Sequence, residues 1–157
     1  MASVFTNRFK IRMLEVFCHK AYNAGALPTN LYIALITDAS TPTVDFNTFT
    51  EVTDLTAGNG YTAGGEQLAY NDTDWDVLTE DDANDRAIVQ LKDIVWTAAG
   101  GPLPSAGDGA RFAVLTDDHV TQNSREILAS WDLVAARSVT IGQTLTLQDC
   151  EVRLSTP

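Results

Sequence analysis

The glycine-rich stretch GNGYTAGGEQLA, residues 58–69, matches the pattern G-x-G-x-x-A of dinucleotide-binding sites. Such glycines hold a cofactor when an apolar strand runs into them and a helix follows, because the helix N-terminus then meets the pyrophosphate. Here the polar stretch TEVTDLTA precedes the glycines, and the following GGEQLAY is too short for a long helix. We therefore predict no cofactor. The pattern instead predicts turns with positive φ around Tyr61, at Gly58, Gly60, Gly64 and Gly65.

A run of acidic residues at 72–85, which contains seven Asp and Glu, is the second candidate for chemistry. It begins with the alternating carboxylates of an EF-hand calcium loop: Asp72, Asp74 and Asp76. An EF-hand also needs Gly at its sixth position and Glu at its twelfth, and this chain has neither there, which excludes a true EF-hand. The main prediction is a solvated loop. A looser calcium site, with Glu80 or Asp81 as a further ligand, remains an alternative.

Nucleophilic catalysis needs a Ser or Cys within reach of a His, and the histidines of this chain are His19 and His119. No G-x-S-x-G motif occurs, and Ser130 and Ser138 stand in strand-like patterns without the strained turn that exposes a nucleophile. A pair of carboxylates of the glycosidase kind stays an open alternative, because the separation of the two groups is a three-dimensional property. We predict that the protein is not an enzyme.

The overall charge is acidic, since 21 Asp and Glu against 10 Lys and Arg give a net charge of −11, which opposes nucleic-acid binding. The first twenty residues are the exception, because they hold four basic residues: Arg8, Lys10, Arg12 and Lys20. This cluster is either a solvated helix face or a surface that docks on an acidic partner. No signal peptide or membrane span is recognisable, and we expect synthesis in the cytoplasm. We expect Cys18 and Cys150 to be buried thiols.

These residues must be positioned by a single domain, because 157 residues with 45% hydrophobic and 20% charged side chains are typical of one globular unit. We predict an amphipathic helix over residues 7–24, with Thr6 or Asn7 as its N-cap and Gly25 as its stop. From residue 30 to 157 the pattern changes to short β-like segments. The predicted strands lie within residues 30–38, 44–52, 66–70, 86–98, 111–118, 125–133, 138–148 and 150–155, of which 30–38 is central and 44–52 is an edge strand.

One helix followed by seven or eight strands excludes a doubly wound α/β sheet, because parallel crossovers need long connections. The fold class predicted is therefore mainly β: an antiparallel, jelly-roll-like sandwich with one N-terminal amphipathic helix.

The order of these segments resembles a family of small structural proteins of tailed bacteriophages, the head decoration or cement proteins. The phrases that carry the resemblance run through most of the chain: LYIALIT, GYTAGGEQLAY, DIVWTA, ARFAVLTDD, ILASWDL and the Thr-rich strand near the end. The acidic stretch at 72–85 is not typical of that family.

The resemblance implies a protein without catalysis that binds the outer face of the assembled icosahedral head in the virion. Its implied partners are the major capsid protein and copies of itself, as a homodimer or homotrimer, with no nucleic acid, membrane or small-molecule substrate. The implied interface combines an N-terminal arm over residues 1–6 with the basic helix, at Val4, Phe5, Arg8, Lys10 and Arg12. A tail or fibre-attachment component and a carbohydrate-binding β-sandwich module are the alternatives.

Overall fold

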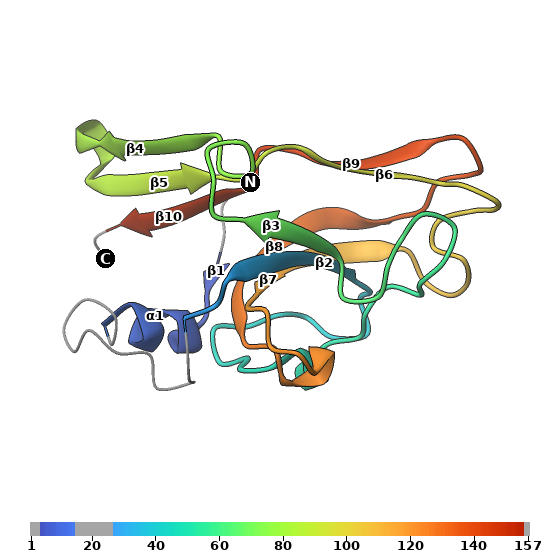
Figure 1. The fold of residues 1–157 in the computed structure, drawn as a ribbon, viewed down its shortest axis with the longest axis horizontal. Helices are drawn as coiled ribbons and strands as arrows, with labels where there is room; N and C mark the ends of the chain where they lie inside the picture. The colour runs from blue at the N-terminus through green and yellow to red at the C-terminus, as the bar shows by residue number, and fades with distance from the viewer. Residues whose placement is uncertain (1–3, 15–26, 156–157) are drawn as a thin grey trace.

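The computed structural model describes residues 4–14 and 27–155, and its larger sheet has five strands in the order β1-β8-β7-β2-β3. Every neighbouring pair in this sheet is antiparallel. The strands are β1 (Val4–Phe5), β2 (Asn30–Ile36), β3 (Glu66–Ala69), β7 (Ala110–Thr116) and β8 (Ile127–Arg137). This sheet forms the lower layer of the molecule in Figure 1.

A three-stranded sheet, β10-β5-β4, and a two-stranded ribbon, β6-β9, form the second layer, along the top of Figure 1. Their strands are β4 (Val77–Asp81), β5 (Arg86–Gln90), β6 (Ile94–Thr97), β9 (Thr144–Leu147) and β10 (Glu151–Ser155). The two pieces share one register, because Gln90 pairs with Glu151, and Ile94, four residues on, pairs with Leu147, four residues back. The strand predicted within residues 86–98 is therefore present, but residues 91–93 divide it.

The main core lies between the two layers. It takes Leu31, Ile33 and Leu35 from β2, and it includes buried residues of the upper layer such as Trp96 and Leu147. The opposite face of β2 is also buried, because Ala34 and Ile36 pack with Phe49 in a second apolar cluster. Both faces of β2 thus exclude water, and the prediction of a central strand from its continuous apolar run is confirmed.

The N-terminal helix α1 (Asn7–Leu14) is anchored to β8. Thr6 is its N-cap, since the Thr6 hydroxyl accepts a hydrogen bond from the backbone N–H of Phe9 at 3.1 Å and donates one to the carbonyl of Ile127 at 2.6 Å. Residues 15–24 of the predicted helix, and Gly25, lie outside the described residues. Cys18, His19 and Lys20 lie outside them too.

The prediction of a separate arm over residues 1–6 is wrong for residues 4–6. Val4 pairs with Ser130 and Phe5 with Ala129, so both belong to the larger sheet as β1. The ring of Phe5 also stacks on that of Phe9, with 4.7 Å between the ring centroids. The apolar side chain of Phe5 thus packs within the domain.

Three predicted segments differ from the structure. Residues 44–52 form no edge strand; they contain a short 3-10 helix, η2 (Phe49–Glu51), which covers the outer face of β2. The acidic stretch 72–85 is not simply a loop, because it contains β4 and the 3-10 turn η3 (Asp82–Asn84). Within 138–148 only β9 is a strand. A third 3-10 turn, η4 (Gln122–Ser124), precedes β8. The mainly β, antiparallel fold class with one helix near the N-terminus is confirmed.

Candidate functional site

An apolar cavity of about 510 Å³ opens at the end of the sandwich where α1 and β4 lie, and we call it the end cavity. Its upper wall is a row of side chains across the three-stranded sheet, since Leu78 of β4 pairs with Val89 of β5, which pairs with Val152 of β10. Its lower wall comes from the larger sheet, through Leu31, Leu115 and Leu128. The cavity is therefore interlayer space that no described side chain fills.

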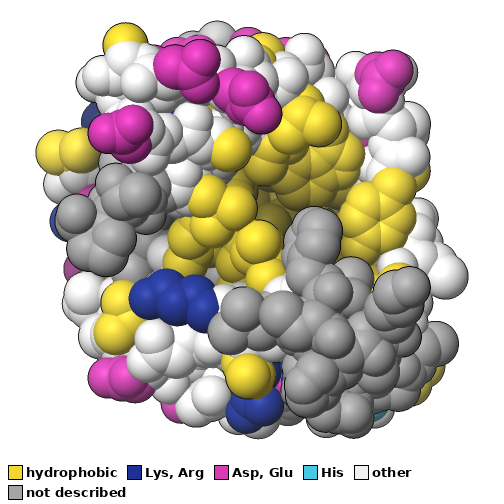
Figure 2. All heavy atoms as spheres, turned by 90° about the vertical axis from the view of Figure 1, so that its left-hand side faces the viewer, with side chains coloured by type: hydrophobic (Ala, Val, Ile, Leu, Met, Phe, Trp, Pro, Cys, Tyr) yellow, Lys and Arg dark blue, Asp and Glu magenta, His cyan; other side chains and the backbone are white. Residues whose placement is uncertain are grey.

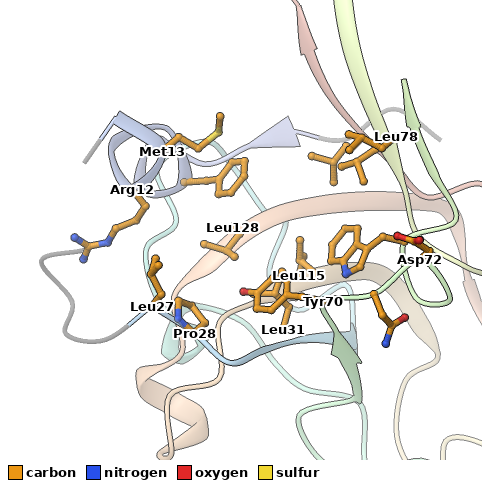
Figure 3. A pocket seen from close by; sticks show the side chains of 15 residues that line it. Arg12, Met13, Leu27, Pro28, Leu31, Tyr70, Asp72, Leu78, Leu115 and Leu128 are labelled. Carbon is orange, nitrogen blue, oxygen red and sulfur yellow. The ribbon is translucent and has the colours of Figure 1, made fainter. Parts of the chain in front are cut away.

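The sides of the end cavity are closed by helix and loop. Phe9 and Met13 contribute the wall from α1, and Tyr70 and Trp75 contribute the opposite one (Figure 3). The indole N–H of Trp75 donates to the carbonyl of Ala69 at 3.1 Å, which fixes the ring beside the end of β3. Burial raises the pKa of Tyr70, and the carboxylates of Asp118 and Asp117 raise it further.

Asp118 positions the chain that enters β2 below the cavity. Its carboxylate accepts hydrogen bonds from the backbone N–H and hydroxyl of Thr29, at 2.8 and 2.7 Å, and from the N–H of Asn30 at 3.1 Å. Burial alone would raise the pKa of Asp118, but these hydrogen bonds outweigh it and hold the pKa below its usual value. The clamp fixes the segment that carries Pro28 and Leu31 into the cavity wall.

Large apolar side chains remain exposed around the mouth of the end cavity. Leu78 is 83% exposed, and Tyr70 and Leu27 are each 57% exposed. Figure 2 shows these apolar surfaces as one hollowed patch, with acidic side chains gathered above it and basic ones below. Contiguous exposed apolar surface of this kind marks sites of protein or ligand contact.

The acidic residues above the cavity divide into two groups. Asp74 is buried, pairs with Lys92, and accepts a hydrogen bond from the N–H of Ala69 at 2.8 Å. The hydrogen bond from Lys92 lowers the pKa of Asp74. Asp81 lies 2.6 Å from Arg86, and hydrogen bonds from Asn84 and Arg86 lower its pKa as well. The exposed group comprises Asp72, Asp76, Glu80, Asp82 and Asp85, and none of these has an ion pair among the described residues.

The structure does not bring the ligands of the alternative calcium site together. Within residues 4–14 and 27–155, no three acidic, His or Cys side chains are grouped so that they could hold a metal ion. Of the three aspartates at the EF-hand spacing, Asp74 turns inward to Lys92, whereas Asp72 and Asp76 remain exposed on either side of it. Asp72 and Asp74 lie in a turn, and Asp76 directly precedes β4.

The basic helix is only partly available to a partner. Arg12 donates two hydrogen bonds to the carboxylate of Glu126, at 2.9 and 2.6 Å, and its guanidinium points away from the end cavity (Figure 3). Arg8 lies 3.6 Å from the same carboxylate. Arg12 as an interface residue stays a prediction; in the structure its side chain fastens α1 to the start of β8. Lys10 is exposed.

The glycine motif builds a turn around a buried tyrosine. All four of its glycines have positive φ: Gly58, Gly60, Gly64 and Gly65. Tyr61 is buried, and its hydroxyl donates to the carboxylate of Asp54 at 2.7 Å and accepts from the N–H of Leu35 at 3.0 Å. Burial, with Asp54 next, raises the pKa of Tyr61 well above its usual value. Through Tyr61, this stretch is hydrogen-bonded to β2 of the larger sheet. It does not line the end cavity.

The candidate catalytic and sugar-binding residues are dispersed. The ring Nδ1 of His119 accepts a hydrogen bond from the backbone N–H of Thr121 at 3.1 Å. Trp96 and Trp131 are buried in the core, which leaves Trp75 as the tryptophan that reaches the end cavity. Cys150 is a buried thiol, and burial raises its pKa to about 12.

Sequence reasoning did not identify the end cavity. Its walls come from segments that are far apart in the chain, and several wall residues are ordinary buried residues of their own strands, namely Leu31, Leu115, Leu128 and Val152. One signal was present: Leu78 stands among acids in a stretch predicted to be solvated.

No described helix has the length and apolar composition needed to cross a membrane. Comparison with known proteins found no matching family model, curated protein or solved structure.

Proposed function

We propose that this protein is a virion structural protein without catalysis, a decoration or cement protein that binds the outer face of an assembled icosahedral bacteriophage head. The observation that carries the proposal is the end cavity, whose exposed Leu78 and Tyr70 give it the character of a contact surface between proteins. The order of sequence phrases that resembles head decoration proteins names the partner: the major capsid protein, together with copies of this chain.

Cementing needs no active site. A protein that binds the assembled shell and not its free subunits stabilises the shell by mass action, and the stabilising free energy grows with the logarithm of its free concentration over its dissociation constant. An apolar cavity rimmed by charge suits this role, because apolar burial supplies affinity and the charged rim selects the partner and speeds encounter. Nucleic acid, membrane and small-molecule substrates have no part in the proposal.

The test is rebinding to heads from which the protein has been stripped. We expect the wild-type protein to rebind and to raise the temperature at which the heads burst. Leu78→Glu places a charge at the mouth of the end cavity and should reduce both effects. Ile141→Glu is the matched control, because Ile141 is 63% exposed in the turn between β8 and β9 and does not line the cavity. Heads that burst at the same temperature with and without the wild-type protein would refute the cement role.

A place in the tail or fibre attachment is the first alternative, and the same particles distinguish it. Antibody-labelled electron micrographs should show label over the whole head surface if the protein is a decoration protein. Label confined to the tail or to one vertex would replace the head assignment.

A carbohydrate-binding module is the second alternative, and Trp75 favours it, because this aromatic ring lines the end cavity together with the half-exposed Tyr70. Aromatic platforms of this kind stack on sugar rings. A module of this class should be retarded on polysaccharide gels, and Trp75→Ala should abolish the retardation. Wild-type mobility that is the same with and without polysaccharide removes this alternative.

A further inference from the structure

The end of the molecule that carries the end cavity has opposite charges on its two sides. On the β4 side, Asp76 and Glu80 are exposed and have no ion pair among the described residues. On the α1 side, Lys10 is exposed, and its contact with Asn7 is long, at 3.5 Å. In Figure 2, acidic side chains lie above the apolar patch, and the basic ones near the patch lie below it, with further acidic ones at the lower left. The surface therefore carries both halves of a complementary charge pair.

Apolar side chains accompany the charges on each side. Ile11 of α1 is 46% exposed next to Lys10, and Leu78 of β4 is 83% exposed two residues from Glu80. The end cavity lies between these two elements. The α1 side thus offers an apolar residue and a positive charge, and the β4 side offers an apolar residue and a negative charge. The two sides are therefore complementary to each other.

We propose that the occupant of this surface is a second copy of the chain, related by a two-fold axis that passes through the end cavity. Such an axis brings α1 of each copy to β4 of the other, so that Lys10 meets Glu80 twice. It also brings the two apolar cavities face to face, and it covers β4, which is an edge strand of its sheet. The inference deepens the proposed function, on which it rests, by naming the surface through which copies of the protein meet; Leu78→Glu then reduces head binding by weakening the contact between copies.

Charge reversal tests this pairing in solution. The wild-type protein should sediment as a dimer. Lys10→Glu and Glu80→Lys should each weaken the dimer by about tenfold or more, because each puts like charges together at two places. An equimolar mixture of the two variants should dimerise again, since the two introduced charges then meet at one contact and the native Lys10 and Glu80 meet at the other. A three-membered ring cannot satisfy all its contacts from such a mixture.

Asp108→Lys is the matched control. Asp108 is exposed in the loop between β6 and β7, so this variant reverses a charge away from the end cavity. Circular dichroism and melting temperatures should show all variants folded. A wild-type protein that stays monomeric, or a dimer that both reversals leave unchanged, overturns the inference. A wild-type protein that stays monomeric but rebinds to stripped heads would overturn the dimer and keep the cement role, whereas a wild-type dimer that leaves stripped heads unbound would do the reverse.

Discussion

The carbonyl oxygen of Thr97 lies where a side chain on Gly60 would begin: a Cβ atom built on Gly60 would stand 2.0 Å from it. Gly65 has the same relationship with the carbonyl oxygen of Ile33, also at 2.0 Å. Because both glycines have positive φ as well, backbone from another strand and the conformation of the turn forbid a side chain together.

Gly60→Ala should therefore destabilise the protein by about 3 kcal/mol or more, from strain at positive φ and from a clash with backbone that has to move. Urea unfolding measures the loss. Gly142→Ala is the control, because Gly142 also has positive φ, but no atom lies within 4 Å of its added Cβ. It should cost only about 1–2 kcal/mol. Equal losses in the two variants would show that the Thr97 contact has no effect.

Tyr61→Phe should cost about 1–3 kcal/mol, because it leaves the N–H of Leu35 and a carboxylate oxygen of Asp54 without their hydroxyl partner. Tyr32→Phe is the control, since the Tyr32 hydroxyl makes only an exposed contact of 3.5 Å with Gln67. Denaturant midpoints compare the two. A Tyr61→Phe protein as stable as Tyr32→Phe would contradict the role of the buried hydroxyl.

Thr6→Ala should cost about 1–2 kcal/mol, because it removes the N-cap of α1 and the hydrogen bond to the carbonyl of Ile127. Thr6→Ser keeps the hydroxyl and should retain most of the stability. Thermal melting distinguishes the pair. If the Ala and Ser variants melt together, the cap does not hold the helix.

Asp74→Asn should destabilise the protein at pH 7 and less at pH 3. The folded state lowers the pKa of Asp74 below its usual 3.8, so the stability from its charge is present above that value and disappears as the pH falls through the lowered pKa. Unfolding free energies of wild type and variant at the two pH values measure this. Asp72→Asn is the control, because Asp72 is exposed and has no described ion pair. If the unfolding free energies of wild type and Asp74→Asn differ as much at pH 3 as at pH 7, the effect does not come from the charge of Asp74.

Local patterns predicted much of this fold. The cap at Thr6, the central strand in NLYIALITD and the glycine turns around Tyr61 each depend on residues close together in the chain, and the structure has all three. The errors have a common cause. Whether residues 44–52 or 77–81 form strands depends on which distant segment is available to pair, and residues 77–81 find β5 whereas residues 44–52 cover a sheet face instead.

The candidate site was harder to predict for the same reason. Arg12 looks like a free cation until Glu126 is placed beside it, and Val4 and Phe5 look like a free arm until β8 pairs with them. The walls of the end cavity join residues from 9 to 152, so no window of sequence contains the site.

The pairing of Val4 with Ser130 also determines when the N-terminal elements can fold as the chain leaves the ribosome. Val4 and Phe5 leave the exit tunnel before β8, which lies more than a hundred residues later in the chain, and they cannot take their place in the sheet until β8 has followed them out. Helix α1 is fastened by Glu126 and by the carbonyl of Ile127, so it too must wait. The wall that α1 gives to the end cavity is thus completed only after Glu126 and Ile127 have left the ribosome, and a nascent chain cannot present a finished contact surface before then.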